Sequence, residues 1–139
     1  MSSELDLSAI REALADVLEE IDGLFVYRTY PGTVLQLPCV ILSLPERIDY
    51  SRTSHQRLDL ALYEMTLIIG RVDPRAQVAL EGLISGKGAT SIREKLYADR
   101  KLGGIISNLR VIGVNTGLYV VPNNSESMLG ADIQVELMA

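Results

Sequence analysis

Apolar residues recur at helical spacing near the start of the chain, between residues 6 and 22. The positions that share this spacing are Leu7, Ile10, Leu14, Val17, Leu18 and Ile21. Charged residues fill the positions between them, so the pattern predicts an amphipathic helix with one buried face. Gly23 is a stop signal for such a helix, and the predicted N-terminal helical segment is therefore 1–23.

Short β-rich runs follow the predicted helix. Residues 25–27 and 39–42 are two such runs, separated by a Pro31-Gly32 turn. Residues 58–71 are the longest strand candidate, but their apolar positions change face. Leu58, Leu60 and Leu62 share one face, whereas Tyr63, Met65, Leu67 and Ile69 share the other.

A single strand buries both sets only with a bulge or a change of environment. We therefore expect a body strand from Tyr63 to Arg71 and an arm that leaves the body near Leu58–Leu62. The polar stretch Glu46 to Gln56 precedes this arm, so residues 46–62 are predicted to form a projecting β-hairpin.

Two helices are predicted in the middle of the chain. Asp73-Pro74 is a strong helix start, because Asp caps free N–H groups and Pro at the first helical position has no N–H to lose. Ser91 and Glu94 have capping-box spacing and begin the second helix. Gly103-Gly104 ends this helical pair, which spans 73–102.

The remaining segment, 108–139, is predicted to consist of strands. They are Leu109 to Val114, Leu118 to Val121 and, after a polar turn at 122–125, a last strand that reaches Met138 with clean apolar alternation. The predicted fold is a single α+β domain over 1–139, a mixed, mostly antiparallel β-sheet with the N-terminal helix and the helical pair packed on it, plus the projecting hairpin arm.

Composition narrows the class without naming a function. A chain of 139 residues is one domain by length, and its net charge of −5 has the wrong sign for gripping phosphates. The aromatic content of 5%, without Trp, argues against a base-stacking platform. Apolar runs are too short for a bilayer span, and no secretory signal is expected after Ser2-Ser3-Glu4. The single cysteine, Cys39, excludes an intrachain disulfide and fits a reducing cytoplasm.

Candidate chemistry is sparse. The segment Gly86 to Ser91 looks like a phosphate-binding loop, but Glu81 stands where that motif needs Gly and Gly88 where it needs Ser or Thr, so a helix connector is favoured. Cys39 with His55 as base is the one nucleophile pair, and a buried structural thiol is the better interpretation of Cys39. His55 has no second ligand at metal-like spacing. We expect no enzyme activity, cofactor or metal.

The predicted arm carries charges of alternating sign. The candidate interface residues are Glu46, Arg47, Asp49, Arg52, Arg57 and Asp59. Such arms suit subunit contacts in which opposite charges set the register. A mobile loop beside an ordinary sheet strand is the alternative interpretation.

Three segments, in order along the chain, together resemble a known family. The first contains Val26-Tyr27, Pro31, Pro38-Cys39-Val40-Ile41 and Leu44-Pro45-Glu46-Arg47-Ile48-Asp49-Tyr50. The second runs from Ile69-Gly70-Arg71-Val72-Asp73 through Leu83-Ile84-Ser85-Gly86-Lys87-Gly88 and Ser91 to Ala98-Asp99-Arg100-Lys101-Leu102-Gly103-Gly104. The third is Leu129-Gly130-Ala131-Asp132-Ile133 with Val135-Glu136. They resemble the tail terminator (tail completion) proteins of long-tailed bacteriophages, particularly those of actinobacterial hosts.

This resemblance implies a structural virion protein that forms a hexameric ring on the finished tail tube, stops tube polymerisation and presents the head-tail joining surface. The implied partners are other copies of the chain, the tail tube protein and the head-tail connector protein, with DNA passing through the channel without being held and no membrane. The implied location is the tail and neck junction of the virion, after assembly in the host cytoplasm.

The resemblance carries over as regions rather than single residues. Glu46–Asp59 corresponds to an element that contacts the tube or a neighbouring subunit, and Asp99–Gly104 to a structural turn, whereas Pro122 to Ser127 departs from the family pattern. A head-side connector or neck subunit is the first alternative. A small-molecule binding or enzymatic domain is the second, and an apolar pocket that includes Cys39 and His55 would favour it.

Overall fold

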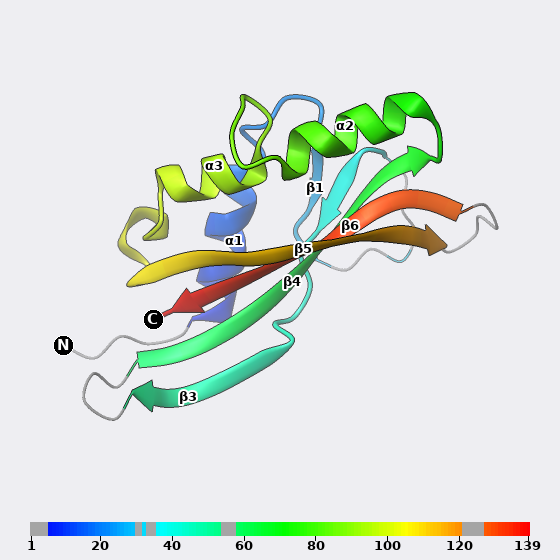
Figure 1. Cartoon of the computed structure of the whole chain (residues 1–139). Helices are drawn as coiled ribbons and strands as arrows, with labels where there is room; N and C mark the ends of the chain where they lie inside the picture. Colours follow the sequence, from blue (N-terminus) through cyan, green and yellow to red (C-terminus); the bar gives the residue numbers. More distant parts are fainter. Residues whose placement is uncertain (1–5, 30–31, 33–35, 54–57, 121–126) are drawn as a thin grey trace.

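Six strands form one sheet in the computed structural model, which describes residues 6–29, 32, 36–53, 58–120 and 127–139. The elements, in chain order, are α1 (Leu7–Leu18), β1 (Phe25–Tyr27), β2 (Cys39–Ile41), β3 (Arg47–Thr53), β4 (Leu58–Arg71), α2 (Pro74–Ile84), α3 (Ile92–Ala98), a 3-10 turn η1 (Leu102–Gly104), β5 (Asn108–Val120) and β6 (Ser127–Met138). This is the predicted α+β class, with helices on a mixed, mostly antiparallel sheet (Figure 1).

The sheet has the strand order β1-β2-β4-β6-β5 (Figure 1). β1 and β2 are parallel, and every other pair is antiparallel. β3 pairs with the first part of β4, on the edge of β4 where β2 pairs further along. β1 and β5 therefore lie at opposite edges of the sheet.

The main core lies between the helices and one face of the sheet. Its strand residues alternate along β6, where Ala131, Ile133, Val135 and Leu137 are all buried. All three α-helices contribute to this cluster. A smaller cluster on the opposite face contains Cys39, Ile41, Ile68 and Met128, with Tyr27 packed against it, and draws no residue from the described helices.

The helix ends follow their capping residues. Asp6 accepts a hydrogen bond from the Ala9 N–H (3.1 Å), and Asp73 accepts one from the Ala76 N–H (2.7 Å), as expected at helix starts. α1 ends at Leu18, earlier than the apolar spacing predicts, and Gly23 sits in the following turn at φ +83°. No helix in the described part of the chain has the length and apolar character of a membrane-crossing helix.

The predicted division of residues 58–71 into an arm and a body strand is wrong. β4 is one continuous strand from Leu58 to Arg71, because β6 extends far enough to pair Leu60–Leu62 with its own last residues. Leu60 is buried on one face while Ala61 and Tyr63 are buried on the other. The hairpin itself is present as β3 and the first part of β4, below the helices in Figure 1.

The predicted separation of Leu109–Val114 from Leu118–Val121 is also corrected. β5 runs without interruption from Asn108 to Val120. Gly113 and Gly117 weaken strand propensity, but pairing with β6 over the whole length outweighs that preference. A register shift between Val111 and Gly113 accommodates one extra residue in β5. The predicted turn at 122–125 lies outside the described residues.

Candidate functional site

The predicted interface residues lie along the β3–β4 hairpin. The Arg47 Nε donates to Asp49 Oδ1 at 2.9 Å, and Asp49 is opposite Leu60 of β4. Glu46 is exposed where the chain enters β3. Asp59 is the second residue of β4, at the end of the hairpin where β3 and β4 are joined, and its backbone N–H and C=O both bond Ala139 (2.7 and 3.0 Å). This end of the hairpin is therefore held against Ala139, which follows β6.

Some of the predicted interface and site residues have no described position relative to the Arg47–Asp49 pair. His55 and Arg57 lie outside the described residues, and so does the side chain of Arg52, although its backbone belongs to β3. The pairing of Cys39 with His55 thus has no geometric description here.

Two large apolar side chains on the same hairpin region were missed by the sequence analysis. Leu44 is 81% exposed just before β3, and Tyr50 within β3 is 73% exposed. Leu44 also lines a surface hollow of about 400 Å³, together with Arg11, Thr29, Leu42 and Ser43. Exposed apolar groups beside a charged pair are typical of a protein-contact surface. The sequence signal was an apolar residue placed directly before Pro45.

Cys39 is fully buried in the smaller cluster. Burial raises the pKa of its thiol to about 11, because a thiolate loses its hydration there, and a hydrogen bond with the Ile68 backbone opposes part of this increase. The thiolate is the nucleophilic form, so a protonated, buried thiol is inert at neutral pH. The prediction of a buried structural thiol is confirmed.

We expect the free energy of unfolding to fall between about pH 9 and about pH 11. The Cys39 thiol has a pKa near 9 in the unfolded chain and about 11 in the fold, so the unfolded state loses its proton first as the pH rises. Above pH 11 the whole difference between these two pKa values lowers the free energy of unfolding by about 3 kcal/mol. Urea unfolding of the wild type and of Cys39→Ala across this interval measures the effect.

Tyr63 also contributes to the pH dependence of stability in that experiment, because burial raises the pKa of its hydroxyl as well. Its contribution is present below about pH 10 and is lost in both proteins at higher pH. The quantity to compare is therefore the difference between the two stability profiles. Parallel profiles would contradict the assignment of a shifted thiol to Cys39.

The Gly86–Ser91 loop is a helix connector, as predicted. The Gly88 N–H, which a phosphate-binding loop would offer to a ligand, donates instead to Glu94 Oε2 at 2.5 Å. Ser91 caps α3 by accepting from the Glu94 N–H (3.2 Å), and its hydroxyl donates to the Ser85 carbonyl at the end of α2. The Glu94 side chain therefore accepts from the Gly88 N–H and not, as in a capping box, from the Ser91 N–H, which donates to the Gly88 carbonyl.

One flank of the molecule is acidic. Arg28, directly after β1, donates to Glu12 (2.7 Å), to Asp16 (2.8 Å) and to Glu19 of α1 and its C-cap. The bonds to Asp16, Glu19 and Glu12 raise the pKa of the guanidinium, so it remains charged. Residues 11–28 contain five acidic and two basic residues, a net charge of −3. We call the surface formed by Glu12, Asp16, Glu19, Glu20 and Asp22 beside β1 the acidic edge.

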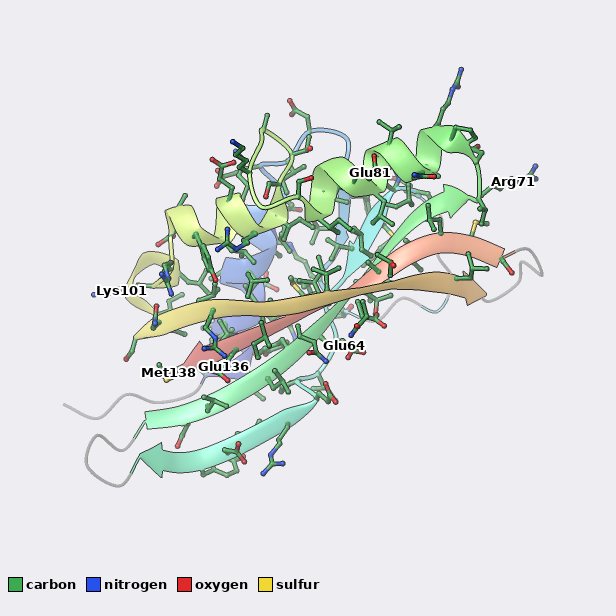
Figure 2. The ribbon with its side chains drawn as sticks, viewed as in Figure 1. Glu64, Arg71, Glu81, Lys101, Glu136 and Met138 are labelled. Carbon is green, nitrogen blue, oxygen red and sulfur yellow. The ribbon has the colours of Figure 1, made fainter. Side chains whose placement is uncertain are left out.

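The opposite flank is basic. Tyr97 of α3 carries the guanidinium groups of Arg93 and Arg100 over its ring, each 4.6 Å from the ring centroid. The Tyr97 hydroxyl accepts from the Val111 N–H (3.1 Å), and Arg100 donates to the Leu109 carbonyl (3.2 Å), so α3 is fastened to β5. We call the surface formed by Lys87, Arg93, Lys95, Arg100 and Lys101 the basic edge; Figure 2 shows Lys101 pointing outward at this end.

The sequence contains a signal for the basic edge that periodicity does not reveal. Residues 87–101 hold five basic and two acidic residues, a net charge of +3, whereas the other 124 residues hold eight and sixteen, a net charge of −8. Whether such a segment faces its own acidic counterpart or lies away from it depends on the strand order. Here the acidic edge is joined to the end of β1 and the basic edge to β5, with β2, β4 and β6 between those two strands, although α1 and α3 contact each other.

Within the described ranges, no group of three or more His, Cys, Asp or Glu side chains is placed to hold a metal ion. Comparison with protein-family models finds no match, and neither does comparison with curated protein sequences.

Proposed function

We propose that this chain is the ring-forming subunit that caps the tail tube of a long-tailed bacteriophage, ends tube polymerisation and provides the head-tail joining surface. The observation that carries the proposal is the resemblance of three ordered segments to tail terminator proteins. Those segments fall on β1 to β3, on the end of β4 through η1, and on β6, so they include part of every described element except α1 and β5. The α+β architecture is the class that the resemblance implies.

The surface of the hairpin suits a contact with the tube. Leu44 and Tyr50 expose apolar area, and the Arg47–Asp49 ion pair lies on the face of β3 opposite to Tyr50. Protein interfaces combine exposed apolar groups with charges of both signs, and the hairpin offers both. The net charge of −5 per subunit fits a ring that lets DNA pass without holding it, because repeated acidic charge gives little attraction for phosphates.

The test is a capping assay. Purified chain is mixed with polymerising tail tube protein, and electron microscopy measures the length of the tubes and the density at their ends. Shortened tubes with a ring at one end support the proposal. A chain that binds the portal assembly and ignores the tube would instead be a head-side connector, and a strictly monomeric chain that never associates with tube protein contradicts both.

The contact role of the hairpin has its own variant. Replacing Arg52 and Arg57 by Glu is expected to leave the mass of the ring unchanged but to raise at least about tenfold the concentration needed to cap half of the tubes, since reversed charges repel the groups they met. Replacing the exposed Arg71 and Arg75 by Glu makes the same change of net charge away from the hairpin. Equal capping by both double variants would remove the hairpin from the contact.

A further inference from the structure

The two charged edges flank opposite ends of the same sheet. β1, beside the acidic edge, pairs only with β2 among the described strands, and β5, beside the basic edge, pairs only with β6. The acidic edge is joined to β1 through Arg28, and the basic edge to β5 through Tyr97 and Arg100. Charge of opposite sign is therefore fixed at the two ends of the strand order.

Each edge also exposes apolar side chains to water. Phe25 in β1 is 41% exposed, and on the other side Ile112 in β5 and Ile105, close to η1, are each 41% exposed. Affinity between proteins comes chiefly from such apolar contacts, whereas the charges around them set partner and register. Both edges have the components of one half of an interface.

We infer that the basic edge of one copy binds the acidic edge of the next copy, which makes the contact head-to-tail. The inference rests on the proposed ring and names the surfaces that build it. The two surfaces are joined to opposite ends of the strand order, so the basic edge of each copy can meet the acidic edge of the next. In a head-to-tail contact each copy uses its basic edge on one neighbour and its acidic edge on the other neighbour. When the rotation between successive copies closes, such contacts generate a ring.

Charge argues for a second copy over nucleic acid as the occupant of the basic edge. The edge includes Glu94 and Asp99 among its cations, and the chain around it is strongly acidic, which repels a polyphosphate at longer range. A second copy brings its segment 11–28, of net charge −3, to the segment 87–101, of net charge +3. A single contact between two copies then neutralises the net charge of both segments.

The experiment uses two complementary triple variants. In the first, Lys87, Lys95 and Lys101 are replaced by Glu, which spares the two arginines stacked on Tyr97. In the second, Asp16, Glu20 and Asp22 are replaced by Lys, which leaves Arg28 bonded to Glu12 and Glu19. Circular dichroism and thermal melting confirm that each is folded, and light scattering coupled to size exclusion measures the mass.

Each triple variant alone is expected to need at least about 100-fold more protein than the wild type to assemble, because every contact then joins like charges. An equimolar mixture is expected to regain the mass of the wild-type ring, since the two variants alternate with opposite charges in contact. The single changes Lys101→Glu and Arg75→Glu form a matched pair, and only the first is expected to weaken assembly.

Two results would overturn the inference while leaving the ring proposal standing. They are a wild-type ring that both triple variants still form, and a mixture that fails to restore assembly. Duplex DNA retained by the wild type and released by the Lys-to-Glu variant, at unchanged ring mass, would assign the basic edge to nucleic acid. A wild type that caps no tubes while the mixture still restores assembly would contradict the proposed function alone.

Discussion

Replacing Tyr63 by alanine is expected to lower the free energy of unfolding by about 3–5 kcal/mol. Tyr63 is 2% exposed, lies in the middle of β4 and is paired with Val135 of β6. Removing the ring leaves a cavity between the sheet and the helices that the surrounding residues fill only in part. For a domain of this size the melting temperature is expected to fall by roughly 10–20 °C, measured by calorimetry or circular dichroism.

Tyr50 provides a control of the same residue type. It is 73% exposed in β3, the strand that pairs with β4, and its replacement by alanine is expected to change stability by no more than about 0.5 kcal/mol. Tyr63→Phe keeps the ring and separates the effect of the cavity from that of the hydroxyl. Equal losses for Tyr63→Ala and Tyr50→Ala would show that β4 does not bury the face described here.

Replacing Ile133 by lysine is expected to abolish cooperative folding. Ile133 is 1% exposed and is flanked in register by Met65 of β4 and Val114 of β5. An ammonium group among these side chains loses its hydration without gaining a partner, which costs several kcal/mol, of the order of the whole stability of an ordinary domain. Loss of the sigmoidal urea transition, followed by intrinsic fluorescence or circular dichroism, is the measurement.

The neighbouring position supplies the matched control. Gln134 lies on the opposite face of β6 and directly opposite Glu64 of β4. A lysine there meets water and a carboxylate, so Gln134→Lys is expected to fold with a stability within about 0.5 kcal/mol of the wild type. A soluble, cooperatively folding Ile133→Lys would refute the assignment of the helix-covered face.

Elements with strong local signals were predictable from the sequence. The apolar spacing of α1, the Asp73-Pro74 start of α2 and the Ser91 cap of α3 each depend on a few adjacent residues, and all three are present. Local chemistry alone accounts for them, because capping and amphipathic burial act within one or two turns. The alternation of β6 was predictable for the same reason.

Features that depend on distant pairing were not predictable. The continuity of β4 requires the end of β6, which is 74 to 78 residues away at the pairs from Leu62–Glu136 to Leu60–Met138. The parallel pairing of β1 with β2 has no local signal. The position of the acidic edge was not predictable for the same reason, because Arg28 bonds Glu12 and Asp16 only when β1 lies beside α1. The Cys39 thiol was the exception, since an apolar run around it already indicated burial.

The continuity of β4 has a mechanical consequence. Its 14 residues, at about 3.3 Å per residue, form a strut roughly 46 Å long that is braced on one side by β6 and on the other by β2 and β3. The pairing of β4 with β6 shifts register only between Ile68 and Gly70, shortly before α2, so a load applied at the hairpin is carried by regular pairing as far as Ile68. In the proposed ring, a subunit that seats its hairpin on a tube would therefore also set the direction of the sheet whose two ends join the charged edges.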